Sequence, residues 1–86
     1  MIKEKENKQE KIEVKIVHSK LRIYINGKIH LSIDIDKIIA FQSYFIGLES
    51  FNIDYYTTDN VMIDTQYTKK YIWDEILKGL DKITLI

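Results

Sequence analysis

Apolar and polar residues alternate along the first part of the chain. Residues 12–18 read IEVKIVH, with an apolar side chain at every second position as far as Ile16, and residues 21–25 and 28–35 continue the same period. A period of two is typical of strands that bury one face. We therefore expect three consecutive antiparallel strands here. His18 follows in phase with the apolar positions, so we expect it to face the core at the end of its strand.

The Asn26-Gly27 pair separates two of these expected strands. A two-residue loop would oppose the apolar set of one strand to the polar set of the next. A three-residue loop that includes Ile25, with Gly27 in the left-handed conformation, instead pairs Ile23 with Ile29 and keeps the apolar sets together. We therefore predict the three-residue, bulged hairpin. Its outer face would carry Lys20, Arg22, Tyr24, Lys28, His30 and Ser32.

The same argument from parity, that the loop length must keep the apolar side chains of both strands on one face, applies to residues 51–67. A three-residue loop at 58–60 would pair Tyr55 with Ile63 and leave Asn60 in the left-handed position that asparagine tolerates. On the opposite face this register places Asp54 directly across from Asp64. Two like charges in that position are unfavourable, so this face requires an explanation.

Two further segments complete the expected fold. Residues 38–46 form an apolar run that ends at Gly47, and we predict a central or doubly covered strand. Residues 68–83 change to a helical period, with Thr68 as the expected N-cap, Trp73 as the main side chain in the core, and an outer Asp74–Lys78 pair. The helical apolar stripe consists of Ile72, Trp73, Ile76, Leu77, Leu80 and Ile83.

The pattern thus predicts the α+β class, an antiparallel β-meander of five or six strands packed against one C-terminal α-helix. Residues 1–11 are expected to form a flexible charged N-terminal tail, because charges alternate there without apolar anchors after Ile2. Residues 12–86 are expected to form a single small domain.

Composition excludes several kinds of chemistry. The 86 residues include no cysteine and only three scattered glycines, so no thiolate site, thiol nucleophile or glycine-rich phosphate loop is available. No histidines are paired at metal-ligand spacing, and no serine has a convincing base. We therefore expect no catalytic residues, no metal site and no cofactor. No apolar run reaches the length of a signal peptide core or a membrane span, so we expect a cytoplasmic protein without membrane contact.

The zero net charge hides an asymmetry along the chain. Residues 1–30 carry eight basic and four acidic side chains, whereas residues 31–86 carry five basic and nine acidic ones, which gives +4 and −4. Acidic, tyrosine-bearing strand surface suits a protein partner with a basic surface. The candidate partner-binding residues are Asp54, Tyr56, Met62, Asp64 and Tyr44.

We therefore expect a non-enzymatic protein-binding module. A small proline-free chain of this kind would suit a phage or mobile-element protein that inhibits a host nuclease, as anti-CRISPR proteins do. One alternative is a small nucleic-acid-binding protein, in which cations bind phosphates and a tyrosine stacks on a base; its residues would be Lys20, Arg22, Tyr24, Lys28 and His30. Another alternative is a homo-oligomer formed by the two oppositely charged faces.

Overall fold

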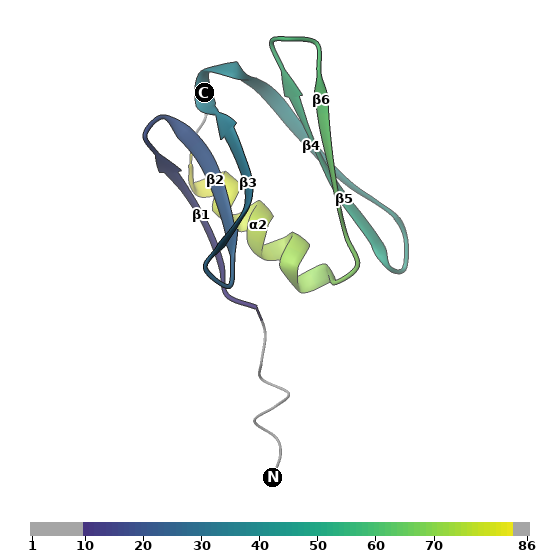
Figure 1. Cartoon of the computed structure of the whole chain (residues 1–86). Helices are drawn as coiled ribbons and strands as arrows, with labels where there is room; N and C mark the ends of the chain where they lie inside the picture. Colours follow the sequence, from purple (N-terminus) through teal and green to yellow (C-terminus); the bar gives the residue numbers. More distant parts are fainter. Residues whose placement is uncertain (1–9, 84–86) are drawn as a thin grey trace.

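The computed structural model describes residues 10–83, which form six strands, one short 3-10 helix and one α-helix (Figure 1). This confirms the α+β class, the antiparallel strands and the C-terminal helix. Most of the predicted N-terminal tail, residues 1–9, lies outside the described residues. The elements are β1 (Ile12–Val17), β2 (Lys20–Ile25), β3 (Lys28–Asp34), η1 (Ile35–Lys37), β4 (Ile38–Gly47), β5 (Ser50–Thr57), β6 (Met62–Tyr67) and α2 (Lys70–Lys82).

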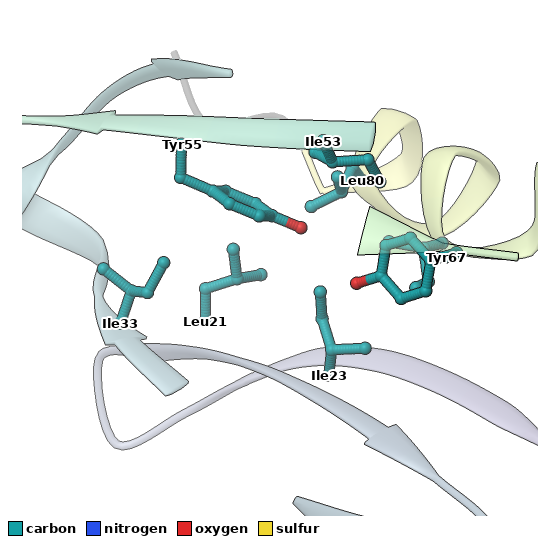
Figure 2. Packing of buried hydrophobic residues seen from close by; sticks show 8 residues of the cluster. Leu21, Ile23, Ile33, Ile53, Tyr55, Tyr67 and Leu80 are labelled. Carbon is teal, nitrogen blue, oxygen red and sulfur yellow. The ribbon is translucent and has the colours of Figure 1, made fainter. Parts of the chain in front are cut away.

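The six strands are divided between two sheets rather than forming one continuous meander. Strands β1–β3 form the N-terminal sheet and β4–β6 form the C-terminal sheet, each in sequential order. The inner faces of the two sheets oppose one another (Figure 2), and α2 contacts β1 of one sheet and both β5 and β6 of the other. The buried cluster between them contains Leu21, Ile23, Ile33, Ile53, Tyr55, Tyr67, Ile76 and Leu80.

The hairpin between β2 and β3 differs from the prediction. Its loop has two residues, Asn26 and Gly27, both with positive φ, which is the type I′ geometry that follows the twist of the strands. The extra residue that keeps the apolar side chains of the two strands on one face lies within β3 and not in the loop. Tyr24 pairs with Ile29, whereas the preceding Ile23 pairs with Leu31, so one residue of β3 is skipped. The predicted three-residue loop is therefore wrong, although a bulge does restore the apolar register.

The bulge and the preceding turn also place both histidines differently from expectation. His30 is the unpaired bulge residue in β3. His18 has a φ of 52° and lies exposed in the two-residue turn between β1 and β2, so the prediction that it faces the core is wrong. The reason is that β1 ends at Val17, before the in-phase position is reached.

The hairpin between β5 and β6 agrees with the prediction. Tyr55 pairs with Ile63, and Asp54 lies opposite Asp64. The Thr57 amide and hydroxyl both donate to the carbonyl of Val61, and the left-handed φ of Asn60 completes the turn. This loop is correctly predicted because the extra residue that keeps the apolar side chains on one face lies in the turn itself.

Strand β4 is an edge strand, so the prediction of a central or doubly covered strand is wrong. It pairs only with β5, and Ile39, Phe45 and Ile46 are each about two-thirds exposed, at 65%, 66% and 67%. An apolar composition indicates that a strand can be buried, but the position of that strand within the sheet depends on contacts between residues distant in sequence. The central strand of this sheet is the less apolar β5.

The amphipathic helix is confirmed, but its boundary and pairs are corrected. It begins at Lys70 with Lys69 as N-cap and no side-chain cap, so Thr68 is not the cap. Asp74 pairs with Lys70 in the first turn, at 2.9 Å between Nζ and Oδ2, rather than with Lys78. Lys78 instead pairs with Glu75 at 3.6 Å.

The expected role of Trp73 is also corrected. Its ring is half-buried, packs on Phe51, and donates from Nε1 to the Asn52 carbonyl at 2.9 Å. Ile76 and Leu80, which are almost completely buried, provide the main contact of α2 with the core. Trp73 therefore anchors the start of the helix to β5 instead of filling the centre of the core.

Two buried tyrosines on the same side of the C-terminal sheet should respond in opposite ways to loss of the hydroxyl. Tyr55 is fully buried and its hydroxyl has no partner among the described residues, whereas the Tyr67 hydroxyl lies 2.7 Å from Nε2 of His30. We expect Tyr55→Phe to raise the free energy of unfolding by about 1 kcal/mol and Tyr67→Phe to lower it by about 1 kcal/mol. Urea denaturation of both variants checks this, and equal shifts of the same sign would contradict it.

Close contact between α2 and β1 makes Gly79 a second test. An added Cβ at Gly79 would lie 2.6 Å from Cβ and Cγ2 of Val14, whereas one at Gly47 would meet nothing within 4 Å. Alanine normally stabilises a helix interior by about 1 kcal/mol over glycine, but overpacking costs about 1–3 kcal/mol. We expect Gly79→Ala to lower the melting temperature and the control Gly47→Ala to leave it nearly unchanged. An increase for Gly79→Ala would contradict the close packing.

Candidate functional site

The structure brings the five predicted partner-binding residues onto one surface. On β5, Asp54 and Tyr56 lie opposite Asp64 and Met62 of β6. Tyr44 lies on the same face, on β4, which flanks β5 on the edge opposite β6. This surface is the face of the C-terminal sheet that points away from the core. We call it the outer sheet face, and it consists of Gln42, Tyr44, Asn52, Asp54, Tyr56, Met62, Asp64 and Gln66.

Side chains of this face bond to one another across the strands. Tyr56 donates its hydroxyl to Oε1 of Gln42 at 3.2 Å, and Asn52 donates from Nδ2 to Oδ1 of Asp64, also at 3.2 Å. Gln66 donates to the Ser50 hydroxyl at 2.7 Å. These contacts hold polar groups in fixed positions on this face, on which no helix or sheet of the described residues packs.

Asp54 is the electrostatic centre of the outer sheet face. Only 4% of the residue is exposed, and its Oδ1 atom has no hydrogen-bond partner among the described residues. Burial raises the pKa of the Asp54 carboxyl, and the hydrogen bond and negative charge of Asp64 raise it further, while a hydrogen bond from Tyr44 acts in the opposite direction. Neither aspartate forms an ion pair with a described lysine, arginine or histidine.

An apolar hollow adjoins the acidic pair at the β5–β6 turn. Met62 and Val61 are about half exposed, and together with Ile39 and Tyr56 they line a depression of ≈ 410 Å³. The surface therefore combines uncompensated negative charge with accessible apolar area, as protein-binding patches do.

Sequence reasoning missed Asn52, Gln42 and Gln66 as members of this face. Asn52 stands two positions before Asp54, so the period of two on β5 could have identified it. Gln42 could be placed only after the pairing of β4 with β5 was known.

The predicted basic face is dispersed by the bulge in β3. Lys28 lies opposite Ile25, which places it on the other side of the sheet from Arg22. His30 packs against Tyr67, with 5.4 Å between the ring centroids, and burial lowers the pKa of its imidazole. The structure therefore does not assemble Lys28 and His30 with the other candidates for nucleic-acid binding.

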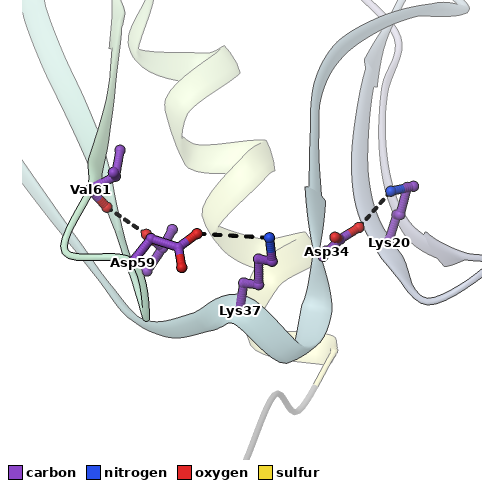
Figure 3. Close-up of polar contacts among 6 residues, drawn as sticks. Lys20, Asp34, Lys37, Asp59 and Val61 are labelled. Carbon is purple, nitrogen blue, oxygen red and sulfur yellow. Dashed lines mark hydrogen bonds and ion pairs between the residues drawn. The ribbon is translucent and has the colours of Figure 1, made fainter.

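The remaining basic residues are partly engaged. Lys20 forms an ion pair with Asp34, and this contact lowers the pKa of the Asp34 carboxyl (Figure 3). Arg22 lies at 3.4 Å from the Tyr24 hydroxyl, and Lys15 lies over the Tyr24 ring at 5.3 Å from its centroid. Of the candidate residues, Arg22 and Tyr24 therefore stay together on one face, with Lys15 beside them.

A third feature lies where η1 crosses between the sheets. A pocket of ≈ 330 Å³ opens there, and Figure 3 shows the Lys20–Asp34 and Lys37–Asp59 pairs at its rim. The distance between Nζ of Lys37 and Oδ2 of Asp59 is 3.7 Å. Because each lysine faces a carboxylate, the rim offers a ligand little net charge.

The described part of the chain contains no cluster of three or more histidine, cysteine or acidic residues that could hold a metal ion. None of its helices is long and apolar enough to cross a membrane. No protein family matches the chain, and neither the curated proteins nor the solved structures include a significant match to it.

The pKa of Asp54 gives this face a measurable pH dependence. An acid whose pKa is raised by folding binds its proton more tightly in the native state, so stability falls as the pH rises from about 4 through the native pKa. We expect Asp54→Asn to stabilise the protein by up to about 1 kcal/mol at neutral pH, the size of a cross-strand pair effect, and by much less below pH of about 4. Denaturation at both pH values, with the exposed Asp36→Asn as control, measures this. A gain that is independent of pH would contradict the assignment.

Proposed function

We propose that this protein is a non-enzymatic protein-binding module that uses the outer sheet face to bind a partner with a basic surface. The observation that carries the proposal is the opposed Asp54–Asp64 pair, which lacks a described cationic partner although Asp54 is almost completely buried. A buried charge without compensation is costly, and proteins normally pair such groups.

A partner's arginine or lysine would supply the missing charge. An arginine placed over the pair would bond to the exposed carboxylate of Asp64 and offset its repulsion with the neighbouring Asp54. Binding would thereby relieve a cost already present in the free protein. Electrostatic attraction of this kind also speeds association with a positive surface.

The apolar hollow beside the pair would provide anchoring contacts. Tyr56 and Met62 line it, and aromatic residues with methionine are enriched where protein interfaces are most apolar. The charged pair would orient the partner, while these two side chains would contribute most of the buried area.

Positive surfaces that suit this face include the grooves with which nucleases hold nucleic acid. We therefore retain, as the specific form of the proposal, a small phage or mobile-element inhibitor that binds such a groove on a host nuclease in the cytoplasm. The nucleic-acid-binding alternative is less well supported, because Lys28 and His30 do not join Arg22 on one face.

The test is affinity capture with a tagged protein from nuclease-treated lysate of the source cell or its host. We expect the wild-type protein to retain a discrete protein partner, and the double variant Tyr56→Ala with Asp64→Lys to lose it. The lysine would face Asp54 and remove the like-charge repulsion, so this variant should not unfold through that position.

The control is Arg22→Glu, which changes charge on the N-terminal sheet and should leave capture of the partner intact. Capture that survives the double variant but not Arg22→Glu would overturn the proposal. Recovery of nucleic acid, or loss of all partners after nuclease treatment, would instead favour the nucleic-acid-binding alternative.

A further inference from the structure

Strand β4 has an unusual free edge. It pairs with β5 on one side only, and its ten residues, IIAFQSYFIG, include no charged residue and no proline. The other strands at sheet ends in the described residues, β1, β3 and β6, each carry charged side chains. Charges and prolines are the usual means by which proteins prevent edge strands from pairing with another chain, and β4 lacks both.

The same strand carries much of the accessible apolar area. Of the eight large apolar side chains that are exposed among residues 10–83, half lie on β4 or in the turn that follows it: Ile39, Phe45, Ile46 and Leu48. Phe45 and Leu48 also line an apolar hollow of ≈ 300 Å³ together with Phe51 and Trp73. An uncharged edge with apolar flanks is a surface that another strand would cover.

We propose that β4 pairs antiparallel with β4 of a second copy, so that two C-terminal sheets join into one sheet of six strands across a two-fold axis. A symmetric contact places each residue near its own counterpart, so any charge close to the axis would meet a like charge. The absence of charge along the whole of β4 is therefore the condition that self-pairing requires.

The sequence of β4 is complementary to itself in one particular register. The ladder with β5 is regular from Ala40 to Phe45, so side chains alternate strictly between the two faces there. A two-fold axis at Ser43 keeps each face continuous and places Phe41 opposite Phe45 of the second copy, twice. On the other face it places Gln42 opposite Tyr44 of the second copy.

These pairs suit the side chains involved. Phe41 and Phe45 lie in phase with the buried Tyr55 and Phe51 of β5, yet Phe45 is 66% exposed in the single chain. Aromatic cross-strand pairs stabilise antiparallel sheets, and an amide can hydrogen-bond to a phenol. The pairing would cover the exposed ring and add backbone hydrogen bonds along the free edge.

Single cysteines test the register, because the chain has none of its own. At the axis the two Cα atoms of residue 43 would be about 4.5–5.5 Å apart, within the range of disulfides. The position opposite Ala40 on the second copy is six residues away from Ala40 of that copy. The two copies of residue 40 would therefore lie about 20 Å apart. We expect Ser43→Cys to form a disulfide-linked dimer under mild oxidation and the matched control Ala40→Cys to remain largely monomeric. Equal cross-linking of the two variants would overturn the proposed register.

Charged substitutions at the axis test the pairing itself. The measurement is the mass in solution, determined by sedimentation at protein concentrations from about 1 μM to 1 mM. The wild-type chain should approach twice its 10.3 kDa mass as the concentration rises. Ser43→Lys alone and Ser43→Glu alone should remain monomeric, while an equal mixture of the two should regain the dimer mass. The control Ser32→Lys, on β3, should dimerise like the wild type.

Other outcomes overturn the proposal. A wild-type chain that stays at 10.3 kDa throughout, or a Ser43→Lys variant that associates normally, would exclude self-pairing through β4. Circular dichroism of each variant verifies the fold. The double variant Tyr56→Ala with Asp64→Lys should still dimerise, so failure of this proposal and failure of the proposed protein-binding function are observed separately.

Discussion

Mutual covering of two three-stranded sheets is the constraint on which the rest of the structure depends. Each sheet has one apolar face, and neither has another layer to bury it except the opposing sheet and α2. Leu21 and Ile23 from one side and Ile53 and Tyr55 from the other are completely buried in this contact. Small chains hide a limited share of their surface, so this single interface has to supply most of the hydrophobic stabilisation.

The limited size of that interface explains the two unusual surfaces. Ser43 and Phe45 occupy the same face of the C-terminal sheet as the buried Ile53 and Phe51, but both remain exposed because they lie on the edge strand. Burial is most complete on β5, the only strand of this sheet with neighbours on both sides. Nearly all of its residues are buried, on the outer face as well as on the inner one, because flanking side chains screen them.

Burial of both faces of β5 explains why polar atoms without partners gather there. Oδ1 of Asn52, Oδ1 of Asp54 and the hydroxyl of Tyr55 all lack a described partner. Such groups usually cost stability, and natural proteins contain few of them. Tyr55 lies within the core, where no ligand can reach it, whereas Asn52 and Asp54 lie on the face that a partner could cover.

How far the sequence predicts this molecule depends on how local each feature is. Strand existence, the β5–β6 register and the apolar stripe of α2 follow from side-chain periodicity, which depends only on neighbouring residues. Parity showed that the β2–β3 hairpin needed a bulge, but not that the bulge would lie at His30, since the type I′ turn of Asn26-Gly27 and the packing on Tyr67 decide that together. That one displacement moved Lys28 and His30 off the predicted basic face.

The grouping of the candidate residues on one face was predicted better than the position of the edge strand, for the same reason. Asp54, Tyr56, Met62 and Asp64 belong to one hairpin, so their grouping needed no contact distant in sequence. The position of β4 depends on which strands flank it, and its composition is equally compatible with a buried centre and an exposed edge. Its complete lack of charge is informative only once the strand is known to be exposed.

Symmetry assigns different partners to the two surfaces of the C-terminal sheet. If two copies met through the outer sheet face, the Asp54–Asp64 pair of one would approach the acidic pair of the other, and the repulsion already present in each chain would increase. An acidic face therefore favours a different, basic molecule, whereas the neutral β4 edge carries no such penalty toward its own copy. Because the edge and the face belong to the same sheet, pairing through β4 would place two outer sheet faces on one continuous surface, and a partner that presents two basic sites could be bound by both at once.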